Sequence, residues 1–169
     1  MKTVNVENSM ESERIWFTPE GKKVSDETIL SWVKKSNEDK DKECKLIVGT
    51  DSHCHKREFR FVTVVCLYQV GRGGYYYYTN TYQDRKLYKG NQKARMMHEV
   101  SLSVETSNWL VDMTEMIPEI HIDASPEDAG HFTSDFSDQL KGYATSYGFL
   151  AEIKPESWVA NAVADKHSK

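Results

Sequence analysis

Residues 45–83 read KLIVGTDSHCHKREFRFVTVVCLYQVGRGGYYYYTNTYQ, and this stretch decides the fold class. It opens with KLIVGT, a short apolar run bounded by charge and glycine, which is typical of a buried strand. Residues 59–70 are rich in β-branched and aromatic side chains, and residues 75–83 continue this pattern after a glycine-rich turn. Because no helical pattern separates the three runs, they predict an antiparallel three-stranded meander.

The pattern changes to helical spacing after this meander. Residues 91–113 carry apolar side chains three and four positions apart, and Pro118 ends the helical stretch. Short strands are expected at 119–124 and 149–153, with one helix between them and a last helix after Ser157. Strand, helix and strand in this order require parallel neighbours and right-handed crossovers. We therefore expect an α/β fold with a mixed five-stranded sheet, the order βββαβαβα and helices on both faces.

The first part of the chain differs from the rest. Residues 1–13 are polar and are expected to form a loose arm, whereas RIWFTPE at 14–20 indicates a short strand. Ser25 is placed as the N-cap of a helix with an apolar side. We expect an N-terminal arm and helix over residues 1–43, packed on a main domain over residues 44–169.

Composition excludes several classes of protein. A chain of 169 residues matches one domain, at roughly 100–200 residues per domain. The net charge is −4 and 28% of the residues are charged, which excludes a membrane protein and a bulk DNA coater. The N-terminus lacks the apolar core of a signal peptide. Three cysteines without a CxxC pair predict reduced thiols in a cytoplasmic protein: Cys44, Cys54 and Cys66.

Two aspartates follow apolar runs. Asp51 comes after LIVGT and Asp123 after IHI, so we expect both at the carboxyl ends of strands, where open α/β sheets place their ligands. Each also has a purely structural interpretation. Asp51 would begin a turn with Ser52, and Asp123 would cap the segment SPED.

The helix expected at 91–113 contains a further inward acid. Helical projection places Glu99 within the broad apolar arc and Glu105 on a solvated face. Glu99 is therefore predicted to point inward and Glu105 outward. The alternative for Glu99 is a salt bridge to Arg95 or Lys93.

The last helix contains the fourth acid. Projection places Asp165 on the same side as Trp158 and Ala162, directed toward the domain, whereas the alternative is an exposed acid next to Lys166. Four inward carboxylates repel one another unless protons or cations intervene. All-oxygen sites of this kind suit Mg²⁺ or Mn²⁺.

Several short motifs resemble a known superfamily. IDAS at 122–125 resembles the Asp-Ser segment that ends the fourth strand of ribonucleases H, and NAVAD at 161–165 resembles the Asn-x-x-Ala-Asp of their last helix. With GTDSH, EVSLSVE, HIDAS, IKPES and VADKH, residues 44–169 resemble ribonuclease H-like proteins, most of all the uncharacterised bacterial YkuK group. Lys154 stands in the stretch where ribonucleases H carry a catalytic-loop histidine.

The resemblance implies a metal-dependent nuclease that hydrolyses phosphodiester bonds of RNA, DNA or a hybrid with two Mg²⁺ or Mn²⁺ ions. Asp51 is implied to bridge the two ions, His53 to transfer protons and Lys154 to pair with a phosphate oxygen. The implied metal ligands are four carboxylates: Asp51, Glu99, Asp123 and Asp165.

Other interpretations stay open at this point. A catalytically silent nucleic-acid-binding or protein-binding module would keep the same fold. An actin-like nucleotide hydrolase would need a second comparable domain and glycine-rich phosphate loops. A zinc site would draw on His53, Cys54 and His55, with His121 on the strand that ends at the second aspartate. The basic stretch RKLYKGNQKAR at 85–95 fits a phosphate-contacting loop or a merely solvated one.

Overall fold

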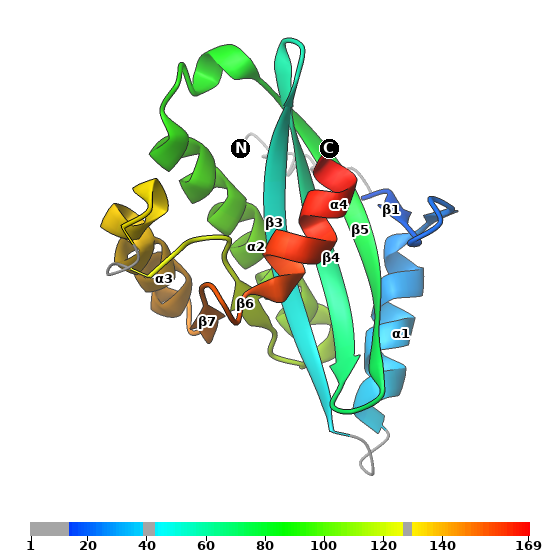
Figure 1. Cartoon of the computed structure of the whole chain (residues 1–169). Coiled ribbons are helices and arrows are strands. Elements are labelled where there is room, and N and C mark those ends of the chain that lie inside the picture. The colour runs from blue at the N-terminus through cyan, green and yellow to red at the C-terminus, as the bar shows by residue number, and fades with distance from the viewer. Residues whose placement is uncertain (1–13, 39–42, 127–129) are drawn as a thin grey trace, which may run out of the picture.

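A mixed sheet forms the centre of the molecule in a computed structural model that describes residues 14–38, 43–126 and 130–169 (Figure 1). The sheet has seven strands in the order β2-β1-β5-β4-β3-β6-β7. Its longest strands are antiparallel neighbours of 12 residues each, namely β3 (Cys44–His55), β4 (Glu58–Gln69) and β5 (Gly73–Asp84). The predicted meander is therefore confirmed.

The second half of the chain adds the parallel part of the sheet. After β5 come a short 3₁₀ turn, η1 (Arg85–Leu87), and the long helix α2 (Gln92–Thr114). Strand β6 (Glu119–His121) pairs in parallel with β3, and β7 (Ala151–Glu152) pairs in parallel with β6. Between these two strands lie η3 (Phe132–Phe136) and α3 (Ser137–Ser146), and the chain ends in η4 (Val159–Ala164) and α4 (Asp165–Ser168). This is the predicted order βββαβαβα.

The sheet is larger than the five strands expected, because the N-terminal segment adds to its edge. Strand β1 (Trp16–Phe17) pairs with β5, and β2 (Lys23–Val24) pairs with β1. Trp16 is completely buried and stacks on Trp109 of α2 at 5.9 Å between ring centroids. Strands of two residues are too short to show an alternating pattern, so their pairing is set by tertiary packing rather than by periodicity. Residues 1–13, expected as a loose arm, lie outside the described residues.

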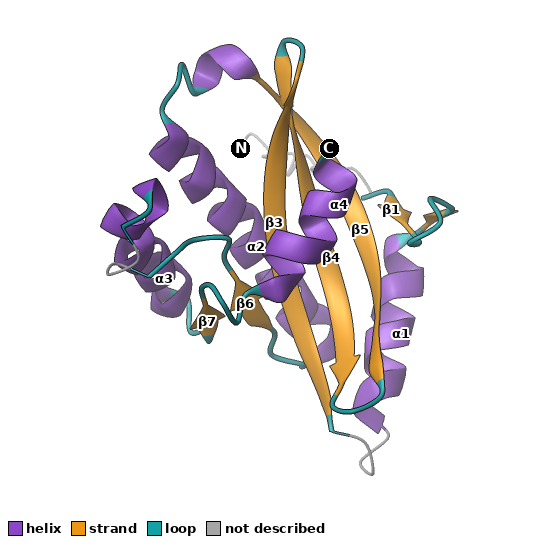
Figure 2. Ribbon diagram, viewed as in Figure 1, coloured by secondary structure: helices purple, strands orange, loops and turns teal. Residues whose placement is uncertain are grey.

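Helices cover both faces of the sheet, as expected (Figure 2). On one face, helix α1 (Asp26–Glu38) contributes Ile29 and Val33 to a cluster with Leu46 and Val48 of β3 and Leu110 of α2. On the same side, α3 packs with α2 over β6 and β7. The opposite face carries the C-terminal helix, whose apolar residues pack on the alternate side chains of β3 and β4. The two faces of β3 therefore meet different helices.

A close backbone approach fixes the C-terminal helix over β3. A Cβ atom added at Gly49 would lie 2.9 Å from the backbone nitrogen of Ala160, so only glycine fits at this crossing. The crossing lies two residues before Asp51 in the chain.

The C-terminal helix contains a π-helical segment, and this corrects the projection made for it. Within η4 the turns are wider, and the N–H of Asp165 bonds to the carbonyl of Ala160, five residues back. Ala160 and Ala164 face the sheet, whereas Ala162, which was expected to point inward, is exposed. A projection at 3.6 residues per turn fails here because the π-helical turn holds more residues.

Two further expectations can be compared with the described residues. No helix among them is long and apolar enough to cross a membrane. Cys44, Cys54 and Cys66 are all free, as expected for reduced thiols.

Candidate functional site

Asp51 lies within β3, not at its carboxyl end as expected. The strand continues to His55 because a two-residue turn joins it to β4 in unbroken register. Asp51 faces the C-terminal helix, where its Oδ2 accepts a hydrogen bond of 2.7 Å from Ser168 Oγ. Burial raises the pKa of Asp51, and the charges of Asp123 and Asp165 raise it further, against the lowering effect of the Ser168 bond.

Asp123 follows β6, the parallel neighbour of β3. The parallel register pairs Gly49 with His121, the last residue of β6, and Asp51 and Asp123 each follow two positions later in the chain. Beyond Gly49, this edge of β3 has no strand partner among the described residues, which lets side chains from both faces of the sheet reach it. The strands that carry the two aspartates are therefore neighbours, and the charge of Asp123 acts on Asp51.

Lys154 pairs with this second aspartate. Its Nζ lies 2.6 Å from Asp123 Oδ1, and its backbone N–H donates to the carbonyl of Ala124. This short contact between opposite charges joins the ammonium to a buried carboxylate oxygen of Asp123. Lys154 thus points into the candidate site.

Glu99 reaches the site from α2, on the other face of β3. It is only 6% exposed, and its Oε1 accepts a hydrogen bond of 2.6 Å from Ser52 Oγ. Burial is the largest cause that raises the pKa of Glu99 to about 8, followed by the negative charge of Asp51. Ser52 and the guanidinium of Arg95, 3.5 Å away, oppose this rise only in part. Glu99 therefore gives up its proton less readily than an exposed glutamate.

The predicted orientation of α2 is confirmed. The side chain of Glu105 is 66% exposed and pairs with Arg14 at 2.9 Å, whereas Glu99 is buried. The alternative interpretation of Glu99 also holds in part, because Arg95 is its ion-pair partner as well as a hydrogen-bond donor to Ser52.

Asp165 begins α4 and lies partly exposed. Its Oδ2 accepts a hydrogen bond of 2.6 Å from Lys169 Nζ, one turn further along the chain. The basic neighbour considered from sequence was Lys166, but Lys169 is the one that pairs with this acid. Asp165 nevertheless belongs to the group, since its charge raises the pKa of Asp51.

The histidines do not gather into a zinc site. His53 is exposed, with its ring 5.7 Å from that of His55, while His55 Nε2 lies 2.9 Å from the carbonyl oxygen of Ser168. His121 is occupied elsewhere, between Glu119 and the backbone N–H of Val159. Within the described ranges, no three His, Cys, Asp or Glu side chains stand in a metal-binding arrangement.

The donor set nevertheless fits a hard divalent cation in its chemistry. All four acids offer carboxylate oxygens, which Mg²⁺ and Mn²⁺ prefer. The negative charges of Asp51 and Asp123 raise the pKa of Glu99, and those of Asp123 and Asp165 raise the pKa of Asp51, so a cation between these groups would favour their ionised forms. In this structure protein groups balance the acids, so an ion would have to displace some of them. These groups are Arg95, Lys154, Ser168 and Lys169.

Two of these partners were missed from sequence. Ser168 and Lys169 follow Asp165 at spacings of three and four, which is the ordinary spacing of helical neighbours and marks no site. Ser168 contacts Asp51 across 117 positions of chain, and no local pattern encodes such a contact. Ser52 was noted only as part of a turn, although it is the donor to Glu99.

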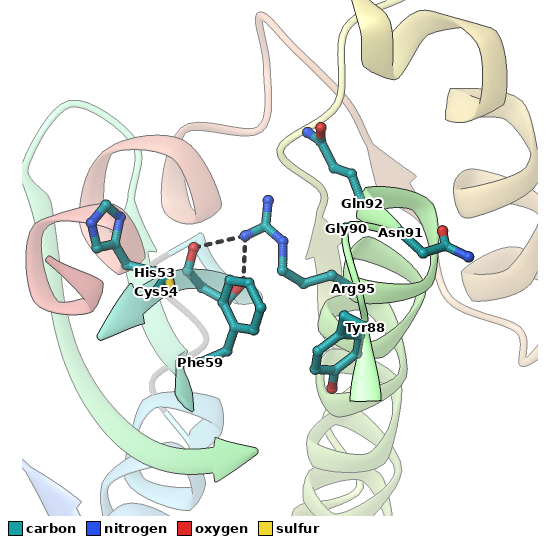
Figure 3. A pocket seen from close by; sticks show the side chains of 9 residues that line it. His53, Cys54, Phe59, Tyr88, Gly90, Asn91, Gln92 and Arg95 are labelled. Atoms are coloured by element: carbon teal, nitrogen blue, oxygen red, sulfur yellow. Dashed lines mark hydrogen bonds between the residues drawn. The ribbon is translucent and has the colours of Figure 1, made fainter. Parts of the chain in front are cut away.

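A pocket opens beside the acids, between the β3–β4 hairpin and the start of α2 (Figure 3). Its volume is about 370 Å³. Arg95 spans it, with Nη1 donating to the carbonyl oxygen of Ser52 at 3.0 Å and to Ser52 Oγ at 2.7 Å. The guanidinium also lies 5.2 Å from the ring centre of Phe59. The pocket therefore touches the same serine that holds Glu99.

Comparison with known proteins gives one family and one relative. A family model described as Ribonuclease H-like matches residues 27–169. The chain is similar to an uncharacterised protein of Bacillus subtilis (strain 168), YkuK, with 27% identity over 140 residues that cover 73% of this chain and 78% of that protein. No solved structure matches the chain significantly.

Proposed function

Because the chain belongs to the ribonuclease H-like family, we propose that it is a divalent-metal-dependent nuclease that hydrolyses phosphodiester bonds of nucleic acid. The observation that supports this proposal is that the charges of Asp51 and Asp123 both act on the buried carboxyl of Glu99, next to the edge of β3 that has no strand partner beyond Gly49 among the described residues. Each acid comes from a different part of the fold. Burial and neighbouring negative charges raise the pKa values of Asp51 and Glu99. Such an arrangement lowers stability unless cations are bound, and that favours a functional explanation.

The four carboxylates would hold two Mg²⁺ or Mn²⁺ ions. The residues that would hold them are Asp51, Glu99, Asp123 and Asp165, with Asp51 as the central ligand. A divalent ion bound here supplies a Lewis acid for a phosphate oxygen and lowers the pKa of a bound water.

The chain's own residues perform the remaining tasks. Glu99 has to give up its proton to become a ligand, and Ser52 and Arg95 hold its carboxylate in place as it does so. Lys154, now on Asp123, is placed to pair with a phosphate oxygen. His53 is exposed on the same strand face as Asp51, where it can exchange protons with solvent.

Thermal melting with and without Mn²⁺ tests the metal site. Asp51→Asn removes repulsion from Asp123 and Asp165, so the metal-free variant should melt at a higher temperature than the wild type. Mn²⁺ at 100 times its Kd should stabilise the wild type by about 2.7 kcal/mol and the variant much less. Asp112→Asn is the matched control, because Asp112 is exposed on α2. An equal Mn²⁺ shift in all three proteins would place the ion elsewhere.

A second candidate is a catalytically silent module that keeps the fold and binds nucleic acid or protein. The observation in its favour is that Arg95, Lys154 and Lys169 pair with three of the four acids in the metal-free structure. Cleavage assays separate the two candidates. Metal-dependent cleavage of single-stranded or hybrid nucleic acid, lost in Asp51→Asn, supports the nuclease. A Mn²⁺ shift without any cleavage supports the silent module.

A further inference from the structure

Cationic side chains gather at one end of the molecule, around the β3–β4 turn and the connection from β5 to α2. A hollow of about 760 Å³ there is lined by five cations, one acid and a glycine: Lys56, Arg57, Arg85, Lys86, Lys89, Asp84 and Gly90. All five cations are exposed, and none of them forms an ion pair with a described residue. The one acid caps the short turn η1, because Asp84 Oδ1 accepts a hydrogen bond of 2.8 Å from the backbone N–H of Lys86.

The concentration of charge is unusual for this chain. The protein as a whole carries a net charge of −4, so the five unpaired cations stand apart from the average surface. Lys56 and Lys89 also have left-handed backbone conformations, with φ of 52° and 37°, which glycine adopts at lower cost. The two segments are joined by a hydrogen bond of 2.9 Å from the N–H of Arg85 to the carbonyl of Arg57. This bond therefore fixes the two segments that carry the cations relative to each other.

This basic hollow continues into the pocket beside the acids. Gly90 lines both, and the smaller pocket leads from there to Arg95 and Ser52, which contact Glu99. Aromatic side chains form part of its wall, with Phe59 and Tyr88 in edge-to-face contact at 5.5 Å between ring centres. A volume of about 370 Å³ leaves room for one flat base, and a base can enter a pocket only when it is unstacked, as it is in a single strand.

We propose that these two hollows form one channel for single-stranded nucleic acid. The backbone phosphates lie on the five cations, and one unpaired base enters the smaller pocket between Arg95 and the aromatic wall. The strand is thereby led from the hairpin turn toward Ser52 and Arg95, the two residues that contact Glu99. This proposal rests on the proposed nuclease function and adds to it the surface that selects the substrate. Unpaired phosphodiester chains combine the two chemistries present, anionic groups at regular spacing and flat rings between them.

Fluorescence anisotropy with labelled 12-nucleotide oligouridylate and oligothymidylate tests the basic half of the channel. The measurements are made in EDTA, so that binding is read without metal chemistry. Arg57→Glu with Lys86→Glu should weaken binding at least tenfold and reduce the slope of log affinity against log salt by about 1.4, since each single-strand phosphate contact contributes about 0.7. The matched control, Lys22→Glu with Lys23→Glu, changes the net charge equally at exposed positions elsewhere and should bind like the wild type.

Equal weakening by both double variants would overturn the channel, because it would report net charge alone. Unchanged binding by the Arg57 and Lys86 variant would also overturn it. The comparison of the two oligomers identifies RNA or DNA as the preferred source of the strand. Circular dichroism melting confirms that each variant is folded before its affinity is compared.

The base pocket is tested from the ligand side, which avoids mutating buried aromatic residues. An oligomer with abasic positions should bind at least fivefold more weakly than oligothymidylate, and a 12-base-pair duplex should bind more weakly than either single strand. Equal affinity for the abasic oligomer, or tighter binding of the duplex, would overturn the single-strand proposal. The Mn²⁺ melting shift is independent of these results, so failure of the channel and failure of the metal site are distinguishable.

Discussion

Ser52 Oγ donates a hydrogen bond of 2.6 Å to Glu99 Oε1, and this contact joins the central strand to the long helix beside the acids. Arg95 donates to the same hydroxyl from one turn earlier in α2. Glu99 is thereby held in a buried position where its ionisation is costly. The contact links the packing of α2 on β3 to the protonation of the candidate site.

Removing this hydroxyl should lower stability. Ser52→Ala removes the hydroxyl donor to buried Glu99 Oε1, while Arg95 keeps its bond to the backbone carbonyl of residue 52. A buried polar group that loses its hydrogen bond costs about 1–3 kcal/mol of unfolding free energy. Urea unfolding measures the change. Ser101→Ala is the control on α2, because its hydroxyl bonds only to the nearby carbonyl of His98. If the two variants lose equal stability, the Ser52 contact has no special role.

The stability of the metal-free protein should depend on pH through Glu99. Its pKa is about 8 in the folded protein against an ordinary value of 4.5, so between these values the folded state holds a proton that the unfolded state has released. Stability is therefore greatest below pH 4.5 with respect to this group and falls as pH rises toward 8. The slope is at most about 1.4 kcal/mol per pH unit.

Glu99→Gln should reduce this dependence. Unfolding free energies measured in EDTA from pH 5 to 8 should contain a fall in the wild type that the variant lacks, while both keep the contributions of the other shifted groups such as Asp51 and His121. Glu105→Gln keeps the wild-type slope, because Glu105 is exposed. A wild-type slope that survives undiminished in Glu99→Gln would assign the titration to another group.

The close approach at Gly49 should be intolerant of any side chain. In Gly49→Ala the new methyl would meet the backbone of Ala160, which cannot move without displacing the C-terminal helix. We expect a loss of about 1–3 kcal/mol, as for other overpacked cores. Gly142→Ala in α3 meets nothing within 4 Å and should be neutral or stabilising. A Gly49 variant as stable as the wild type would contradict the tight crossing.

Regular elements could be predicted from the sequence because their periodicity is local. The long strands and α2 span enough residues to show their periodicity. The order of the elements and the inward orientation of the Glu99 side chain could therefore be predicted from residue spacing. The parallel pairing of β6 with β3 agrees with the parallel neighbours that a strand–helix–strand order requires.

The parts that could not be predicted depend on tertiary packing or on small irregularities. A π-helical segment changes the phase of the last helix without a change in residue type, so Ala162 was placed on the wrong side. The end of an apolar run did not mark the end of β3, because polar residues continue the hairpin beyond Asp51. Ser168 contacts Asp51 although 117 positions of the chain separate the two residues.

Lys169 should compete with metal for Asp165. Its ammonium lies 2.6 Å from Asp165 Oδ2 and occupies an oxygen that the proposed site needs, while the Asp165 charge raises the pKa of the lysine. Lys169→Met removes this competitor, and the pair is exposed, so the melting temperature in EDTA should hardly change. The Mn²⁺ concentration that gives half of the melting shift should fall severalfold. Lys166→Met, which removes an exposed lysine from the same helix, is the control and should leave it unchanged. If Lys169→Met binds Mn²⁺ no better than the control, Asp165 is not a ligand, and the ion rests on Asp51, Glu99 and Asp123 alone.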